Sequence, residues 1–374
     1  MPDYLNSVPG QESARSVLSN LLLADKIPHA LLFTGIEGCG KEYAALRFIL
    51  QLNAAAYHDI RQLESKITSF SEPFVKYIFP LPRGRNETDE SGPYEKLNSD
   101  EMEIIKTEIL KKGKNPYYQM MIPKANNIKI NSIRDIKKFL SMNYDDIKYR
   151  VVLISKAHLM NETAQNALLK NLEEPPEGVI FILVTHLPEQ LRETIRSRCW
   201  VVNFHPLKPE ILKKILISDF GVSEKDAGLV VPFAAGSVQT ALGLLNENIE
   251  ALIDKTIHIL RYSFGKKYNL ALNEMNDLYE NKDTVQFKLL INLILIWFND
   301  LQKYSTGLTD FAFETEKQTL EKFYSKFPKV DLKGIIFRLD KLSSLIQNNI
   351  ALNLLIANLI FELASVTTIV KTSE

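Results

Sequence analysis

The stretch that decides the fold is residues 29–42, HALLFTGIEGCGKE. Its first half is a short apolar run that favours a buried β-strand, and a helical pattern follows its second half. Between the two, Gly35, Gly38 and Gly40 form a glycine-rich turn that leads directly into Lys41. Glycines at this spacing bring backbone N–H groups toward phosphate oxygens at a helix N-terminus, where the lysine reaches the β and γ oxygens. The stretch therefore predicts a phosphate-binding loop (P-loop).

Both elements that would bind a metal ion beside such a loop are altered. The position after the lysine should be Ser or Thr, because that hydroxyl binds Mg²⁺, and Glu42 stands there instead. A hydrolytic P-loop enzyme also ends a neighbouring strand in Asp, whereas the run Val151–Ile154 continues into Ser155 and Lys156. We interpret the nearby His158 as a packed or surface histidine. We therefore expect no metal site, no ATP hydrolysis by this chain alone, and a loop that has no ligand or binds ATP at most weakly.

The first half of the chain alternates between strand and helix patterns. Continuous apolar, β-rich runs favour strands that are covered on both faces. These runs are residues 29–35, 151–155, 179–185 and 199–204. Helical patterns extend from Lys41 to about Asn53 and from Asn161, which is expected to cap its helix, to just before Pro175. This alternation predicts a parallel α/β sheet.

From about Pro206 onward the strand signal fades. Short helical patterns at residues 209–218 and 237–245 give way to long amphipathic patterns from about Asn246. We predict an α/β plus all-α protein with three domains. They are a P-loop α/β domain at residues 1–207 with an insertion around 54–119, a small helical lid domain at 208–245, and a C-terminal helical bundle, or collar, at 246–374.

Composition excludes several classes of protein. The 374 residues include 45 Lys and Arg against 45 Asp and Glu, which argues against a uniformly basic DNA coat. Two cysteines cannot form a disulfide framework or a four-Cys zinc site. The charge is uneven, because residues 86–110 carry a net charge of −6 and residues 111–150 a net charge of +7. We expect both blocks to be solvated, with residues 83–94 as an exposed loop and Ser99 capping a helix that Gly113 stops.

The sequence favours a cytoplasmic protein. Its N-terminus lacks the basic and apolar regions of a secretory signal. Residues 289–298 are too short a run to span a bilayer, and residues 342–361 contain seven Ser, Gln or Asn residues. We expect the latter run to form a buried helix of the bundle, with no contact with a membrane.

Four segments occur in an order that resembles a known family. They are Val8–Glu12 (VPGQE), Ile27–Gly35 (IPHALLFTG), Asn166–Pro176 (NALLKNLEEPP) and Arg196–Cys199 (RSRC). Together they resemble the AAA+ clamp-loader subunits of bacterial DNA polymerase III over about Leu5–Pro206. The resemblance implies an AAA+ P-loop domain, a helical lid and a C-terminal collar through which five subunits form a ring.

Within this family, the altered loop resembles the non-hydrolysing delta-prime type rather than the ATP-hydrolysing gamma/tau type. Gamma/tau subunits would keep Ser or Thr at the position of Glu42 and an Asp-Glu pair at the position of Ser155 and Lys156. The family also usually carries a four-Cys zinc module, and residues 54–119 contain no cysteine. We expect other packing to replace that module, and we expect no cofactor.

The resemblance also implies roles for individual residues. Arg198, between its motif neighbours Ser197 and Cys199, would be an arginine finger that acts in trans on ATP bound by the adjacent subunit. Thr185 matches the position that senses γ-phosphate, although without a metal site it is also simply a strand end. Gln239 stands where the lid usually supplies an arginine, so it cannot supply that charge.

The expected function is that of a delta-prime-like subunit that helps to load the sliding clamp on primed DNA. Its expected partners are the gamma/tau and delta subunits, with the clamp and primed DNA reached through the assembly. Two alternatives stay open at this point. One is an active AAA+ ATPase, either a gamma-like subunit or a helicase loader, and the other is a P-loop-derived scaffold outside replication.

Overall fold

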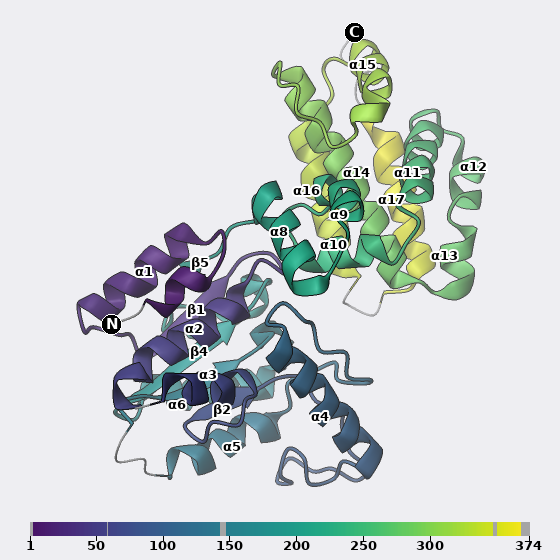
Figure 1. Ribbon diagram of the computed structural model, residues 1–374. Helices are drawn as coiled ribbons and strands as arrows, with labels where there is room; N and C mark the ends of the chain where they lie inside the picture. Colours follow the sequence, from purple (N-terminus) through teal and green to yellow (C-terminus); the bar gives the residue numbers. More distant parts are fainter. Residues whose placement is uncertain (1–2, 58, 143–146, 347–349, 368–374) are drawn as a thin grey trace. The chain divides into compact units, whose positions relative to one another are not determined.

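The computed structural model describes residues 3–57, 59–142, 147–346 and 350–367. The chain divides into two compact units (Figure 1). The first unit is Met1–Gly221 with Gly236–Gln239, and the second is Val222–Ala235 with Thr240–Glu374. The predicted lid at residues 208–245 is divided between them, and the three-domain boundaries stay a prediction.

The first unit contains all five strands of the described chain. Its strands are β1 (Ala30–Thr34), β2 (Val75–Ile78), β3 (Arg150–Ile154), β4 (Val179–Val184) and β5 (Trp200–Asn203). Its α-helices are α1 (Glu12–Leu23), α2 (Lys41–Asn53), α3 (Ile60–Thr68), α4 (Ser99–Lys114), α5 (Ile130–Leu140), α6 (Glu162–Glu173), α7 (Glu193–Arg196) and α8 (Pro209–Phe220). Its 3-10 helices are η1 (Tyr4–Ser7), η2 (Ala54–Ala56), η3 (Ala157–Leu159) and η4 (Pro188–Gln190).

The strands form one parallel sheet in the order β2-β3-β4-β1-β5. Leu32 of β1 pairs with Leu183 of β4 on one side and with Val201 of β5 on the other. β1 is thus an inner strand. The loop that follows it lies at the carboxyl edge of the sheet, which is where α/β folds bind ligands. The predicted parallel α/β fold is confirmed.

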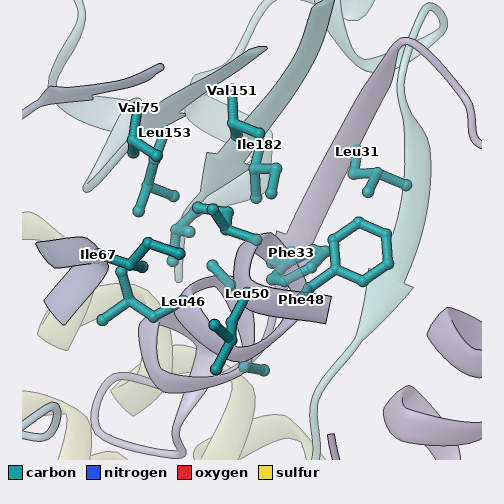
Figure 2. Close-up of a cluster of buried hydrophobic side chains, with 14 of the residues drawn as sticks. Leu31, Phe33, Leu46, Phe48, Leu50, Ile67, Val75, Val151, Leu153 and Ile182 are labelled. Carbon is teal, nitrogen blue, oxygen red and sulfur yellow. The ribbon is translucent and has the colours of Figure 1, made fainter. Parts of the chain in front are cut away.

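Helices cover both faces of this sheet, because successive side chains of each strand point to opposite faces. Leu31 and Phe33 of β1 pack with α1, α2 and α3 in one core (Figure 2). Ala30 and Leu32 belong to a second core on the other face, with α5 and α6. Burial on both faces explains why β1, β3 and β4 are continuous apolar runs.

Local sequence signals predicted the start of α6 correctly but misplaced both ends of α4. Asn161 caps α6, since its side chain accepts a hydrogen bond from the backbone N–H of Ala164. Two predictions about α4 were wrong. Its N-cap is Asn98, which forms a reciprocal capping box with Glu101, and Gly113 lies inside the helix rather than stopping it.

Residues 83–94 form a mostly exposed loop, as predicted, but Glu87 and Pro93 within it are buried. The Glu87 side chain is buried and pairs with the buried Lys129 at 2.8 Å. Lys129 Nζ also donates to the carbonyl oxygens of Pro82 and Pro93. Opposite charges from the two charge blocks thus meet in the interior, and they tie the insertion to the start of α5.

The second unit is helical. Its elements are α9 (Glu224–Val230), η5 (Val231–Phe233), α10 (Val238–Leu245, which begins in the first unit), α11 (Ile249–Phe264), α12 (Tyr268–Asn273), α13 (Asn276–Asn281), α14 (Thr284–Ser305), η6 (Glu314–Glu316), α15 (Lys317–Lys326), α16 (Leu332–Leu345) and α17 (Leu352–Val366). Its core surrounds α14, where Phe287, Leu290 and Trp297 are fully buried.

Two apolar stretches of the second unit differ from the prediction. Residues 289–298 belong to the longer α14, which is the one helix of the described chain that is long and apolar enough to cross a membrane; 61% of its most apolar window is buried. The expected single helix at residues 342–361 is wrong, since α16 ends at Leu345 and α17 starts at Leu352. Residues 347–349, between them, lie outside the described residues.

Candidate functional site: an internally occupied phosphate loop

The glycine-rich turn has the backbone that the sequence predicts. Gly35, Gly38 and Gly40 have φ angles of +141°, +75° and +99° between β1 and α2, values that side chains rarely tolerate. A Cβ atom at Gly35 would lie 2.3 Å from the carbonyl oxygen of Phe204, and one at Gly38 would lie 2.7 Å from the backbone nitrogen of Gln239. The glycines therefore serve close packing against other backbone as well as the turn.

Lys41 is directed into its own loop. Its side chain is buried, and Nζ donates to the carbonyl oxygen of Gly35 at 2.7 Å and to that of Ile36. Burial lowers the pKa of the Lys41 ammonium, although the nearby Cys39 and Glu37 act in the opposite direction. The group that would bind phosphate is thus occupied by backbone carbonyls.

Glu42 is occupied as well. Its carboxylate forms an ion pair with Lys112 of α4 and accepts a hydrogen bond from the hydroxyl of Ser155. Burial alone would raise the pKa of Glu42, but the charge and hydrogen bond of Lys112, together with Ser155, lower it below its usual value. The two residues that depart from the metal-binding pattern, Glu42 and Ser155, therefore bind each other.

A segment of the insertion covers the loop. The Tyr117 side chain packs over Gly40, at 3.4 Å from where a Cβ would be, and the Tyr117 carbonyl oxygen accepts a hydrogen bond from the Gln239 amide. Gln119 donates to the Glu37 carboxylate at 2.9 Å. Only about 130 Å³ remains in the cavity between these groups, well below the roughly 300–1,000 Å³ of typical ligand pockets.

The cavity gathers several of the sequence-predicted residues. Its lining includes Gly38, Gly40, Lys41, Glu42, Ser155, Lys156, Thr185 and Gln239. Thr185 is buried, and its hydroxyl lies 3.0 Å from Nδ1 of His158 and accepts from the backbone N–H of Leu187 at 3.0 Å. Burial, with His186 at a ring distance of 4.4 Å, lowers the pKa of His158 to about 3. The histidine is therefore packed and neutral, as one of the two interpretations of the sequence held.

The Arg198 motif does not line this cavity. Arg198 precedes β5, and its guanidinium donates to the carbonyl oxygen of Thr194 and pairs with Glu173, each at 2.9 Å. The side chain of Arg198 is 36% exposed and Ser197 is exposed. Burial raises the pKa of the Cys199 thiol to about 12, and Cys199 packs against the core on the α5 and α6 face. An accessible guanidinium thus lies beside an unreactive thiol.

Sequence reasoning missed Lys112, Tyr117 and Gln119, the three insertion residues that fill the loop. Lys112 lies 70 positions after Glu42, so no local pattern links them. Glu42 itself could have predicted this partner, because a carboxylate inside a buried loop requires a cation. The positively charged block after residue 110 supplies that cation.

Comparisons with known proteins indicate the family that this chain resembles. The family model for the DNA polymerase III delta subunit matches residues 93–208. Relatives over most of the chain include the tau subunit of DNA polymerase III from Bacillus subtilis, 27% identical over 82% of this chain and 51% of its own length. The delta' subunit of the same organism is 23% identical over 80% of this chain and 79% of its own length. Together these matches support a clamp-loader protein of the AAA+ family.

Two further matches are a sequence relative and a solved structure. The gamma subunit from Buchnera aphidicola is 29% identical over 78% of this chain and 72% of its own length. A solved gamma subunit-related protein from Thermotoga maritima is 16% identical, covers 95% of this chain and 99% of its own length, and has a TM-score of 0.35. The chain spans about half the length of the first tau relative, so the activities of such longer proteins do not transfer directly to it.

Proposed function

We propose that this chain is a non-hydrolysing, delta-prime-like subunit of a cytoplasmic DNA polymerase III clamp loader. The observation that carries the proposal is the buried pairing of Glu42 with Lys112 and Ser155. A carboxylate at this position adds negative charge where polyphosphate would have to bind, and its ion pair with Lys112 occupies the group that could otherwise bind Mg²⁺. Its relatives include both gamma/tau and delta' subunits, so the state of the loop, rather than overall similarity, is the argument for the non-hydrolysing type.

The chemical contribution of the chain would then be made to a neighbour. Arg198 is partly exposed on the surface of the first unit, and a guanidinium supplied in trans to a neighbour's γ-phosphate contributes about 10³–10⁵ in rate, or roughly 4–7 kcal/mol. Its contacts with Glu173 and Thr194 would orient the Arg198 side chain before ATP of the neighbouring subunit binds. The neighbours would be gamma/tau and delta subunits, and the assembly would act on a sliding clamp and primed DNA.

The test is Arg198→Ala in an assembly reconstituted from the organism's own subunits. ATP turnover should fall at one adjacent site while the assembly forms normally, because a surface ion pair contributes at most about 1 kcal/mol to stability. Arg192→Ala is a matched control, since Arg192 makes a comparable exposed pair with Glu162 at 2.7 Å. Equal ATP turnover in both variants would remove the finger role.

The active-ATPase alternative is separated by a titration on the purified chain. The proposal requires no turnover of MgATP by the chain alone and at most weak binding. Tight binding with turnover in the absence of partners would instead assign the chain to the gamma-like class.

A further inference from the structure

We propose that residues 112–119 are a built-in occupant of the P-loop, which holds the loop in one conformation whether or not nucleotide is present. The inference rests on the silent-site part of the proposed function, and it assigns a role to the insertion. The lack of nucleotide binding would then have two causes: the loss of the metal-binding residues and the occupation of the loop by residues 112–119.

The charge of Lys112 is already paired inside the protein. Lys112 places a buried cation beside the P-loop, and its Nζ also donates to the carbonyl oxygens of Pro116 and Tyr118, each at 2.8 Å. These two bonds fix the turn that follows α4, and they leave the ammonium paired with Glu42. A phosphate that approached Lys112 would therefore compete with an ion pair already formed inside the protein.

Hydrogen bonds also connect the same segment to three parts of the first unit. Asn115 donates to the carbonyl oxygen of Asp219 at 3.2 Å, at the end of α8. Tyr117 accepts from Gln239 at the start of α10, and Gln119 donates to Glu37 in the loop. The segment thus joins the P-loop, α8 and α10.

The space over the loop is also limited. Tyr117 is 2% exposed and packs over Gly40, and the cavity that remains is about 130 Å³. A nucleotide at the loop would have to displace the side chain of Tyr117 from over Gly40. Restoring a hydroxyl at position 42 alone would therefore not restore binding, because Lys112 would stay and lose its partner.

Hydrogen exchange on the full chain, with and without millimolar MgADP, tests the proposal. In the native protein, exchange at residues 35–42 and 112–119 should be the same under both conditions. The double variant Glu42→Thr with Lys112→Ala removes both charges together, so it leaves no buried charge unpaired. It should exchange roughly tenfold faster at residues 112–119, as expected for the loss of one or two net hydrogen-bond contributions, and MgADP should then protect residues 35–42.

A second, milder variant tests the proposal if the double variant Glu42→Thr with Lys112→Ala does not fold. Gln119→Ala with Gln239→Ala leaves the ion pair intact, so it should speed exchange at residues 112–119 and 236–239 without creating nucleotide binding. Lys114→Ala, which removes an exposed lysine from the end of α4, should behave as the native chain. Native rates in both double variants would overturn the internal-ligand proposal alone, whereas turnover of ATP by the native chain would overturn the proposed function.

Discussion

Removal of Lys112 should be one of the most destabilising single substitutions in the first unit. In Lys112→Met, the largely buried Glu42 carboxylate keeps its charge and loses its cation. The side chains of the two residues are 6% and 18% exposed, so water replaces little of the lost interaction. Breaking one side of a buried pair of this kind costs about 3–5 kcal/mol.

The companion substitutions give the expected pattern. Glu42→Gln preserves the shape of the side chain and leaves Lys112 bound to two carbonyl oxygens, so its cost should be smaller, about 1.5–3 kcal/mol. The double variant Lys112→Met with Glu42→Gln has no unpaired charge, so its free energy of unfolding should fall by less than that of Lys112→Met alone. The coupling free energy between the two sites should therefore reach about 2–3 kcal/mol.

Urea unfolding of the first unit measures these values. Trp200 is in β5 and Trp297 is in α14 of the second unit, so a Trp297→Phe background leaves fluorescence that reports on the first unit. Lys114→Met is the control, and it should change stability by at most about 0.5 kcal/mol because its side chain is exposed. Additive single-variant costs, with no coupling between positions 42 and 112, would refute the reasoning.

Two further predictions concern the same unit. The pKa of His158 is about 3 in the folded chain and 6.5 in the unfolded chain, so stability should be lost as pH falls below about 6.5, by up to about 1.4 kcal/mol per pH unit. His158→Gln should flatten this part of an unfolding profile, and an unchanged slope would contradict the assignment. Gly35→Ala should cost about 2–4 kcal/mol, because its Cβ would meet the Phe204 carbonyl oxygen at 2.3 Å in addition to the unfavourable φ. Gly221→Ala, which also has a positive φ but nothing within 4 Å, should cost only about 1 kcal/mol in the same denaturation assay.

Prediction from sequence succeeded where the cause was local or periodic. β1, α2 and the Asn161 cap depend on residues within a few positions of one another, and their side-chain patterns read directly as structure. β2 was missed because it has four residues inside the insertion, and it is recognised as a strand only through its pairing with β3. Charge also misled at Glu87 and Lys129, since a net charge per segment does not reveal which charges pair in the interior.

The sequence by itself determined that this chain has a parallel α/β unit with a P-loop, and that Glu42 and Ser155 replace the metal-binding residues. Those features follow from continuous apolar runs, glycine spacing and residue identity. Only the tertiary structure decided what the loop binds. Glu42 meets Lys112 and Gln239 meets Tyr117 across 70 and 122 positions of sequence. Contacts at that separation depend on where the insertion folds back against the sheet. A buried polar or charged group pairs with whichever group the fold places beside it, however far away that group is in the sequence.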